Sequence, residues 1–337
     1  MMHSETLNSK FKQFTDLAAE KLGGKVLYAT DDFFAEKENL IKTGRGIFIP
    51  DKYTDRGKWM DGWESRRKRT PGNDWCVIEL ATTGSIYGFD IDTNHFLGNA
   101  PLHASVEGVF LRHTPTEKEI ISGDLDWIEI LPKIALQPGS QNEFDSLNHD
   151  VFSHLRLQIY PDGGVARFRA YGKVFKQWDI IDSEEEIDLG AAINGGKSIH
   201  CNDMFFSSMD NLIMPGRGVN MGDGWETKRN RTPNNCDWVI IKLATKGHIN
   251  RIVVDTKHFK GNYPDCCMIE GCSSEDDASV LDNEVEWFSL LPKQKLEADT
   301  AHIYTKIEAH EEVTHVRLNI YPDGGVSRLR LYGKILR

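Results

Sequence analysis

The sequence predicts an all-β protein built from two tandem copies of one sandwich or jelly-roll domain. Two observations predict it: long stretches of the first half recur in the second half, and apolar residues alternate with polar ones within each half. No stretch keeps the 3.6-residue period of a long amphipathic helix, although we expect residues 10–22 to form a short helix outside the first sandwich. The length of 337 residues suits two domains of ordinary size.

The internal repeat is long and keeps its order along the chain. A repeated segment of this length indicates a duplicated domain rather than a solenoid unit. The clearest matches pair residues 16–41 with 188–213, 61–67 with 223–229, 92–99 with 255–262, and 160–165 with 321–326.

The boundary between the copies follows from the same comparison. The first copy carries a short insertion around residues 48–59, which the second copy lacks. The acidic stretch 182–186 is the natural linker. We therefore predict one domain over residues 1–181 and a second over residues 182–337.

Period-two alternation predicts the strands and their turns. Residues 155–159 and 167–171 each alternate, and the Pro-Asp-Gly-Gly segment between them has the composition of a turn. We expect a hairpin here, and another formed by residues 77–80 and 86–92. We expect Trp63 and Trp225 to anchor the cores. The other repeated tryptophans fit sandwich cores better than a stacking platform, and they are Trp75, Trp127, Trp238 and Trp287.

The first of these hairpins brings arginines together on its polar face. With a four-residue turn, Arg156 lies opposite Arg169, and in the second copy Arg317 lies opposite Arg330. Like charges directly opposite each other are destabilising unless an anion compensates them. That anion is either a neighbouring carboxylate or a substrate, and the sequence leaves both alternatives open.

A repeated loop supplies candidate catalytic residues. Asp92 and Asp255 each end an apolar strand and open a loop that contains His95 or His258. Loops at one end of a sandwich are where binding groups collect on a rigid frame. A histidine with an acid beside it can act as a general acid or base. The alternative is that both histidines are packed loop residues bonded to the backbone.

Other repeated polar residues are candidates for substrate binding. Glu64 and Glu226 could line a polar pocket with Arg67 and Arg229, or simply pair with these arginines. The predicted binding residues are Asn99, Asn262, Glu107, Glu270, Arg67, Arg229, Arg167, Arg169, Arg328 and Arg330.

Composition limits the classes of partner. A net charge of -11 argues against sequence-independent nucleic-acid binding, which needs a basic face. No apolar run is long enough for a membrane helix, and the first residues lack the apolar core of a secretory signal. We therefore expect a cytoplasmic protein with reduced thiols. Cys266, Cys267 and Cys272 fit no common zinc spacing, and no nucleophile elbow, P-loop or dinucleotide fingerprint is present.

The repeated segments resemble the allantoicase (allantoate amidinohydrolase) family. The resemblance covers nearly the whole chain, in both copies and in the right order. It rests on the Asp-Gly-Trp-Glu segments at 61–67 and 223–229, the Asp-Thr-x-His-Phe loops at 92–101 and 255–264, the Tyr-Pro-Asp-Gly-Gly segments at 160–169 and 321–330, and Pro-Gly-Arg-Gly at 215–218. The first copy has Thr43 in place of the proline of that last motif, so it stays open whether both copies hold equivalent sites.

The resemblance implies a fold and an activity. It implies two jelly-roll domains similar to galactose-binding or discoidin-type sandwiches, and hydrolysis of allantoate to ureidoglycolate and urea in purine (allantoin) breakdown. Allantoate carries one carboxylate, which a guanidinium can grip, and two ureido arms, which Asn, Asp or Glu can bond. No cofactor is indicated, a divalent metal stays open, and we expect a homo-oligomer. The alternative function is a non-catalytic tandem carbohydrate-binding module, because the fold alone does not set the activity.

Overall fold

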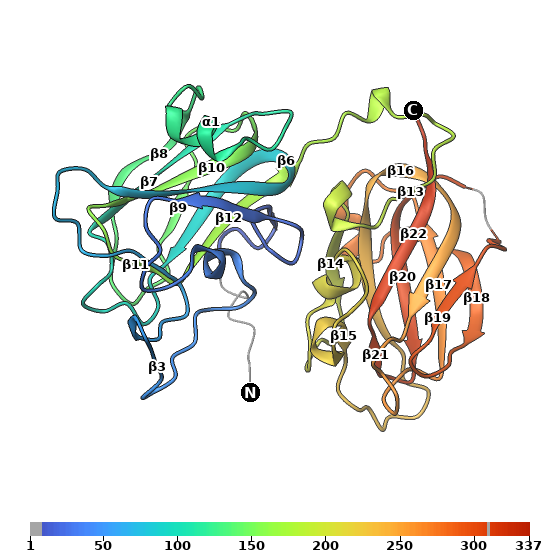
Figure 1. Ribbon diagram of the computed structural model, residues 1–337. Helices are drawn as coiled ribbons and strands as arrows, with labels where there is room; N and C mark the ends of the chain where they lie inside the picture. The colour runs from blue at the N-terminus through green and yellow to red at the C-terminus, as the bar shows by residue number, and fades with distance from the viewer. Residues whose placement is uncertain (1–8, 309–310) are drawn as a thin grey trace. The chain divides into compact units, whose positions relative to one another are not determined.

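The computed structural model describes residues 9–308 and 311–337 and confirms a duplicated all-β jelly-roll architecture (Figure 1). The chain divides between Phe175 and Lys176 into two compact units. Figure 1 draws the first unit in blue to green and the second in yellow-green to red. The acidic stretch 182–186 follows this division and lies within the second unit.

The first unit holds one continuous system of eight strands. Its order is β1-β12-β6-β10-β7-β8, and β2 and β9 also pair with β6. The strands are β1 (Thr15–Asp16), β2 (Lys25–Ala29), β6 (Asp74–Asp92), β7 (His103–Val109), β8 (Ile128–Ala135), β9 (Glu143–Asp145), β10 (Val151–Tyr160) and β12 (Arg167–Val174). Two short pairs complete it: β5 (Trp63–Glu64) with β11 (Gly164–Val165), and β3 (Tyr53–Thr54) with β4 (Gly57–Lys58) inside the predicted insertion.

The second unit repeats this topology without the β3–β4 pair. Its order is β13-β22-β16-β20-β17-β18, and β14 and β19 also pair with β16, while β15 pairs with β21. The strands are β13 (Ile187–Asp188), β14 (Lys197–Cys201), β15 (Trp225–Glu226), β16 (Asp237–Asp255), β17 (Cys266–Cys272), β18 (Phe288–Lys295), β19 (Ala301–Tyr304), β20 (Val313–Tyr321), β21 (Gly325–Val326) and β22 (Arg328–Ile335).

Helical segments are short in both units. The α-helices are α1 (Glu117–Ser122) and α2 (Asp277–Leu281). Short 3-10 segments cover Lys37–Ile41, Trp178–Ile180, Ala192–Asn194, Met209–Ile213 and Met221–Asp223. None of the helices within residues 9–308 and 311–337 is long and apolar enough to cross a membrane.

One long strand in each unit takes part in both layers of the sandwich. The first half of β6 pairs with β10 and β2, and its second half pairs with β12 and β9. The hairpin predicted for residues 77–92 is therefore wrong. Thr82 and Thr83 are β-branched and continue the strand, and Gly84 lets it pass close to Leu17 and the backbone of Lys173.

The predicted pairing of the arginines is also wrong. Arg156 on β10 lies opposite Val77, whereas Arg169 on β12 lies opposite Asp90, so the two arginines occupy different layers. The reason is that the chain leaves the sheet after Tyr160, pairs briefly with β5 through β11, and re-enters beside the other half of β6. The second unit follows the same path, with Arg317 on β20 and Arg330 on β22.

The short helix predicted over residues 10–22 is absent. This stretch forms turns and strand β1, whose Asp16 lies opposite Tyr171 on β12. The Asp16 carboxylate accepts hydrogen bonds from the backbone N–H groups of Ala18 and Ala170. These bonds favour a turn over a helix, and Leu17 is fully buried in the core rather than outside it.

Apolar side chains from both layers fill each core. In the first unit, Val77, Phe89, Ile91, Leu157 and Phe168 are fully buried. All six cysteines are free thiols. Burial raises the pKa of the Cys272 thiol to about 11, so this buried cysteine is an inert core residue at neutral pH.

Asp90 is a buried acid whose counterpart in the second unit is Val253. Its Oδ2 atom accepts a hydrogen bond from Gln141 at 2.8 Å. Burial raises the pKa of Asp90 to about 6; the bond from Gln141 opposes the rise, and the charges of Asp92 and Glu143 add to it. A deprotonated Asp90 therefore costs folding free energy at neutral pH.

Replacing Asp90 by asparagine should stabilise the protein at neutral pH and have little effect near pH 4. The folded chain keeps the proton of Asp90 up to a pH of about 6, whereas the unfolded chain releases it near 3.8. Stability is therefore lost as the pH rises between these two values, by about 3 kcal/mol in total. Denaturant unfolding of both proteins near pH 4 and pH 7.5 measures this difference. An equal gain at both pH values would contradict the expected titration.

Candidate functional site

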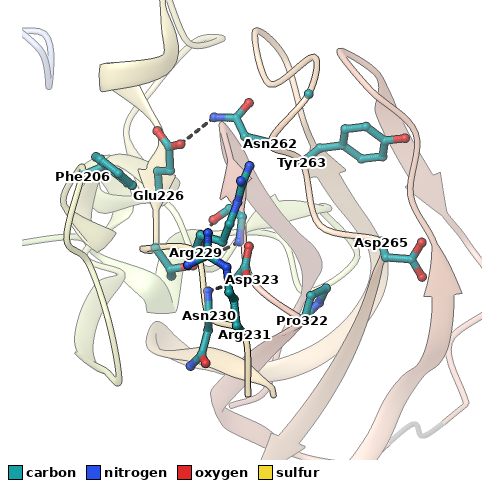
Figure 2. A pocket seen from close by; sticks show the side chains of 13 residues that line it. Phe206, Glu226, Arg229, Asn230, Arg231, Asn262, Tyr263, Asp265, Pro322 and Asp323 are labelled. Atoms are coloured by element: carbon teal, nitrogen blue, oxygen red, sulfur yellow. Dashed lines mark hydrogen bonds between the residues drawn. The ribbon is translucent and has the colours of Figure 1, made fainter. Parts of the chain in front are cut away.

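A pocket of about 840 Å³ opens in the second unit (Figure 2). Three repeated motifs contribute to its lining, although they lie far apart in the sequence. They are the end of β15 and the segment after it, with Glu226 and Arg229, the loop with Asn262, and the turn before β21 with Asp323. The repeated motifs thus converge at one place on the loop end of the sandwich.

Buried aromatic and glycine residues hold these three segments together. Phe259 and Trp225 are fully buried. A side chain at Gly325 would overlap the ring of Phe259, so only glycine lets the turn pack on this ring. The N–H group of Gly325 donates to the carbonyl of Asn262 at 2.8 Å. This bond ties the turn to the loop that carries Asn262.

Glu226 is the half-buried acid of the pocket. The side-chain amide of Asn262 donates to its Oε1 atom at 2.5 Å, as the dashed line in Figure 2 shows. Burial raises the pKa of the Glu226 carboxyl above its usual range, and the bond from Asn262 offsets part of that rise. The amide holds one carboxyl oxygen and leaves the other, Oε2, for a ligand.

Cationic side chains line the pocket beside this acid. Arg229 and Arg231 are exposed lining residues, and neither guanidinium has a hydrogen-bond or ion-pair partner in the described part of the chain. By contrast, Asp323 is held by the backbone N–H of Asn230 at 2.8 Å. The unpaired guanidiniums make the pocket suited to a small anion.

The predicted catalytic aspartates bind arginines of the repeated Gly-Arg-Gly loops. The buried carboxylate of Asp92 accepts two hydrogen bonds from Arg45, at 2.8 and 3.1 Å. Asp255 accepts two from Arg217, at 2.8 and 3.0 Å. Each aspartate thus anchors a neighbouring loop, and neither lines the pocket of the second unit.

The predicted catalytic histidines adopt the same unusual backbone conformation in both units. The φ angles are 69° at His95 and 73° at His258. The Nε2 atom of His258 lies 2.8 Å from the carbonyl oxygen of Gly218, and the ring of His95 packs at 5.6 Å from that of Phe48. Neither histidine is among the residues that line the pocket.

Glu107 and Glu270 lie on a sheet face rather than at the pocket. Glu107 accepts hydrogen bonds from Arg156 at 2.6 Å and from Gln158 at 2.7 Å. Glu270 is bonded in the same way by Arg317 and Asn319. Arg156 and Arg317 stack over Trp127 and Trp287.

The tryptophans divide into two groups. Trp63 and Trp225 are fully buried, as the sequence predicts. The other four are partly buried, and two of them, Trp238 and Trp287, pack against a buried core cluster of the second unit. Trp127 and Trp287 lie under the arginines of the sheet face, and the four are Trp75, Trp127, Trp238 and Trp287.

The remaining predicted arginines are bound to the protein itself. Arg167 and Arg328 are 4% and 3% exposed and pair with Asp61 and Asp223, at 2.7 and 2.8 Å. Arg169 donates to the carbonyls of Lys42 and Gly44, and Arg330 donates to those of Met214 and Gly216. These contacts tie each arginine to loops of its own unit and leave little of each guanidinium for a substrate.

Of the predicted residues, the pocket therefore brings together Arg229 and Asn262. Sequence reasoning gave Glu226 two alternatives, and the structure places it at the pocket wall, bonded to Asn262 rather than to Arg229. Tyr263, Asp265 and Asp323 were missed. Their place in the sequence could have indicated them, because each lies inside or directly beside a motif that recurs in both copies.

The structure also bears on a metal site. Within residues 9–308 and 311–337, no group of three or more His, Cys, Asp or Glu side chains is arranged to hold a metal ion. The pocket contributes carboxylates from Glu226, Asp265 and Asp323, and each of them is bonded to a protein N–H or ammonium donor.

A family model described as the allantoicase repeat matches residues 15–175 and again residues 187–336. The chain belongs to the allantoicase family. A protein named probable allantoicase from Pseudomonas fluorescens is 49% identical over 328 residues, which cover 96% of this chain and 97% of the relative. A probable allantoicase from Photobacterium profundum is 48% identical, with 96% and 97% covered.

Solved structures agree with this assignment. The crystal structure of allantoicase from Saccharomyces cerevisiae superimposes with a TM-score of 0.81 at 37% identity, covering 95% of this chain and 93% of that chain. Family membership and fold therefore extend over both allantoicase repeats.

The first allantoicase repeat has the same scaffold at the matching place. Asn99 donates to Glu64 at 2.7 Å, and the N–H of Gly164 donates to the carbonyl of Asn99 at 2.8 Å. Burial raises the pKa of Glu64 as it does for Glu226. The lining differs, because Ala100, Leu102 and Lys68 stand where the second repeat has Tyr263, Asp265 and Asn230.

Proposed function

We propose that this chain hydrolyses allantoate to ureidoglycolate and urea in allantoin degradation, and that the second-unit pocket is where it does so. The observation that supports this site is that one pocket contains both an acid and a cation. The acid is Glu226, whose pKa is raised, and the cation is Arg229, whose guanidinium has no partner in the described part of the chain. The activity is supported by the family membership, since the relatives matched over nearly their whole length are named allantoicases.

Substrate binding follows from the charges of the pocket. Allantoate carries a single carboxylate and two ureido arms on one carbon. Arg229 offers a planar guanidinium with parallel N–H donors, which matches a carboxylate in a bidentate contact. Arg231 lies in the same lining and adds positive charge. The arms are neutral and carry N–H donors and a carbonyl acceptor, which the polar lining can bond.

Glu226 is the residue that we assign to proton transfer. Expelling urea breaks the bond between the central carbon and one ureido nitrogen, and that nitrogen must receive a proton. Glu226 can deliver it, because its raised pKa keeps a larger share of the carboxyl protonated than in an exposed glutamate. The resulting carboxylate then removes a proton from the water that adds to the carbon. The sum is allantoate plus water giving ureidoglycolate plus urea.

The carbohydrate-binding alternative is not favoured. The lining of the pocket is dominated by charged and amide side chains, namely Glu226, Arg229, Asn230, Arg231, Asn262, Asp265 and Asp323. The family membership over both repeats points the same way.

Several expectations stay predictions. They are a catalytic role for His95 or His258 with Asp92 or Asp255, a cytoplasmic location, a homo-oligomer and a contribution from a divalent metal. The contacts of the two aspartates with Arg45 and Arg217 support a role in holding loops.

The proposal is tested by turnover of the purified full-length chain with allantoate. We expect equal amounts of urea and ureidoglycolate. In the Arg229→Ala variant, KM for allantoate should rise about 10- to 100-fold, because a charge-assisted contact to the carboxylate is lost. The matched Arg67→Ala variant of the first repeat should keep the wild-type KM.

Two results would overturn this assignment. Absence of turnover by the wild-type chain, with and without added divalent metal, would remove the activity. A normal KM for Arg229→Ala together with a raised KM for Arg67→Ala would move the site to the first unit.

A further inference from the structure

We propose that Asp265 binds the ureido arm that stays on the product, and so makes the second-unit pocket selective for a two-armed substrate. This inference rests on the proposed function. Asp265 lines the pocket, and Figure 2 shows it on the opposite side from Glu226, with Asp323 between them in this view.

The comparison of the two repeats isolates this residue. The same hydrogen bonds hold the backbone in both repeats. The N–H groups of Gly164 and Gly325 each donate to the carbonyl of the loop asparagine, Asn99 or Asn262, at 2.8 Å. Asp162 and Asp323 both accept a backbone N–H at 2.8 Å. The side chain on the side of the pocket opposite Glu226 differs between the repeats. It is Asp265 in the second repeat, and Leu102 occupies the matching position of the first. At this place the two repeats therefore differ in side chains and share the backbone frame.

A second difference accompanies the first. Lys295 on β18 donates to the Oδ1 atom of Asp265, and the matching position in the first unit is Ala135 on β8. The acid and its cation are thus both present in one repeat and both absent in the other. The hydrogen bond from Lys295 lowers the pKa of Asp265, so this carboxylate is ionised at neutral pH.

The backbone holds the carboxylate at the pocket wall. The N–H group of Asp265 donates to the carbonyl of Tyr321 at 2.8 Å, and its own carbonyl accepts from Leu296 at 3.0 Å. Lys295 donates to Oδ1, and the Cys266 thiol donates to Oδ2 at 3.1 Å. The side chain is nevertheless 57% exposed, so each oxygen keeps a lone pair that a ligand can reach. The position is therefore fixed while the carboxylate faces solvent.

The chemistry of a ureido group matches this wall. A urea-type group presents parallel N–H donors, and an ionised carboxylate accepts two of them more strongly than a neutral acceptor does. In the first unit the exposed side chain of Leu102 has no acceptor to offer. With one arm at Glu226 and the carboxylate at Arg229, the second arm is the part of allantoate that remains for Asp265.

The inference is tested with the near-isosteric variant Asp265→Asn in the full-length chain. KM for allantoate and the inhibition constant of ureidoglycolate should both rise by the same factor, about 10-fold, because both molecules carry the retained arm. The value of kcat should stay within about 2-fold, as expected when a contact of equal strength in the ground and transition states is removed. Asp265→Leu, which copies the first repeat, should show a larger rise.

Leu102→Asn is the matched control and should leave both constants unchanged. A thermal unfolding curve for each variant separates a folding defect from a binding defect. An unchanged KM in Asp265→Asn would overturn the inference, as would a fall in kcat without a rise in the inhibition constant. If Arg229→Ala is impaired while Asp265→Asn is normal, this inference fails and the proposed function stands. If the wild-type chain has no turnover, both fail.

Discussion

Replacing Glu226 by glutamine should lower kcat for urea release by about 100-fold or more, with little change in KM. Glutamine keeps the size of the side chain and an oxygen that can accept the bond from Asn262. It has no carboxyl proton to deliver to the leaving nitrogen, and a positioned acid or base typically contributes about 100- to 10,000-fold. Initial rates of urea formation over a range of allantoate concentrations measure the effect.

Glu64→Gln in the first repeat is the matched control. Glu64 has the same kind of amide partner and the same direction of pKa shift, yet the first repeat has Ala100 and Leu102 at the positions of Tyr263 and Asp265. We expect this variant to keep most of the wild-type kcat. Equal losses in both variants would mean that both repeats turn over substrate. A loss in Glu64→Gln alone would place the chemistry in the first unit.

The second large effect should come from Phe259, whose ring packs against the turn at Asp323–Gly325 that lines the pocket. Phe259→Ala removes a fully buried ring and should lower the free energy of unfolding by about 3 to 5 kcal/mol. Gly224 and Gly325 both pack against this ring, so the loop with Asn262 loses its support as well. Turnover should therefore fall at temperatures where the variant is still folded. Unfolding curves and urea release at the same temperature measure the two effects together.

Phe96→Ala separates stability from activity. Phe96 is the counterpart in the first unit, is also fully buried, and lies against Gly62 and Gly164. A similar loss of unfolding free energy is expected there, with turnover retained in the folded protein. If both variants lose turnover to the same extent, the support of Phe259 for the pocket is not specific.

The duplicated fold could be predicted from the sequence because its signal is spread over many residues. Matches such as Asp61 to Asp223 and Tyr160 to Tyr321 recur in order, so an error at one position does not change the conclusion. Strand pairing could not be predicted in the same way. Thr82, Thr83 and Gly84 are compatible with a turn, and the partners that keep them in a strand, Leu17 and Lys173, lie far away in the sequence.

The roles of single side chains in the candidate site could not be predicted from the sequence for the same reason, because they depend on partners far away in the chain. Arg167, Arg169 and Arg229 look alike in the sequence as cations beside repeated motifs. Two of them are bound to Asp61 and to carbonyls near Gly44, which only the folded chain brings close. Arg229 has no such partner in the described part of the chain, and this distinguishes a binding group from a structural one.

The long strands β6 and β16 have a consequence for how each unit opens. β6 pairs with β2, β9, β10 and β12, so its backbone amides belong to both layers of one sandwich. One layer cannot unfold while the other stays folded, because separating the layers means breaking the hydrogen bonds of this shared strand. Amide protons in the two layers of a unit should therefore exchange through one common opening, with a single protection energy for each unit rather than one for each sheet.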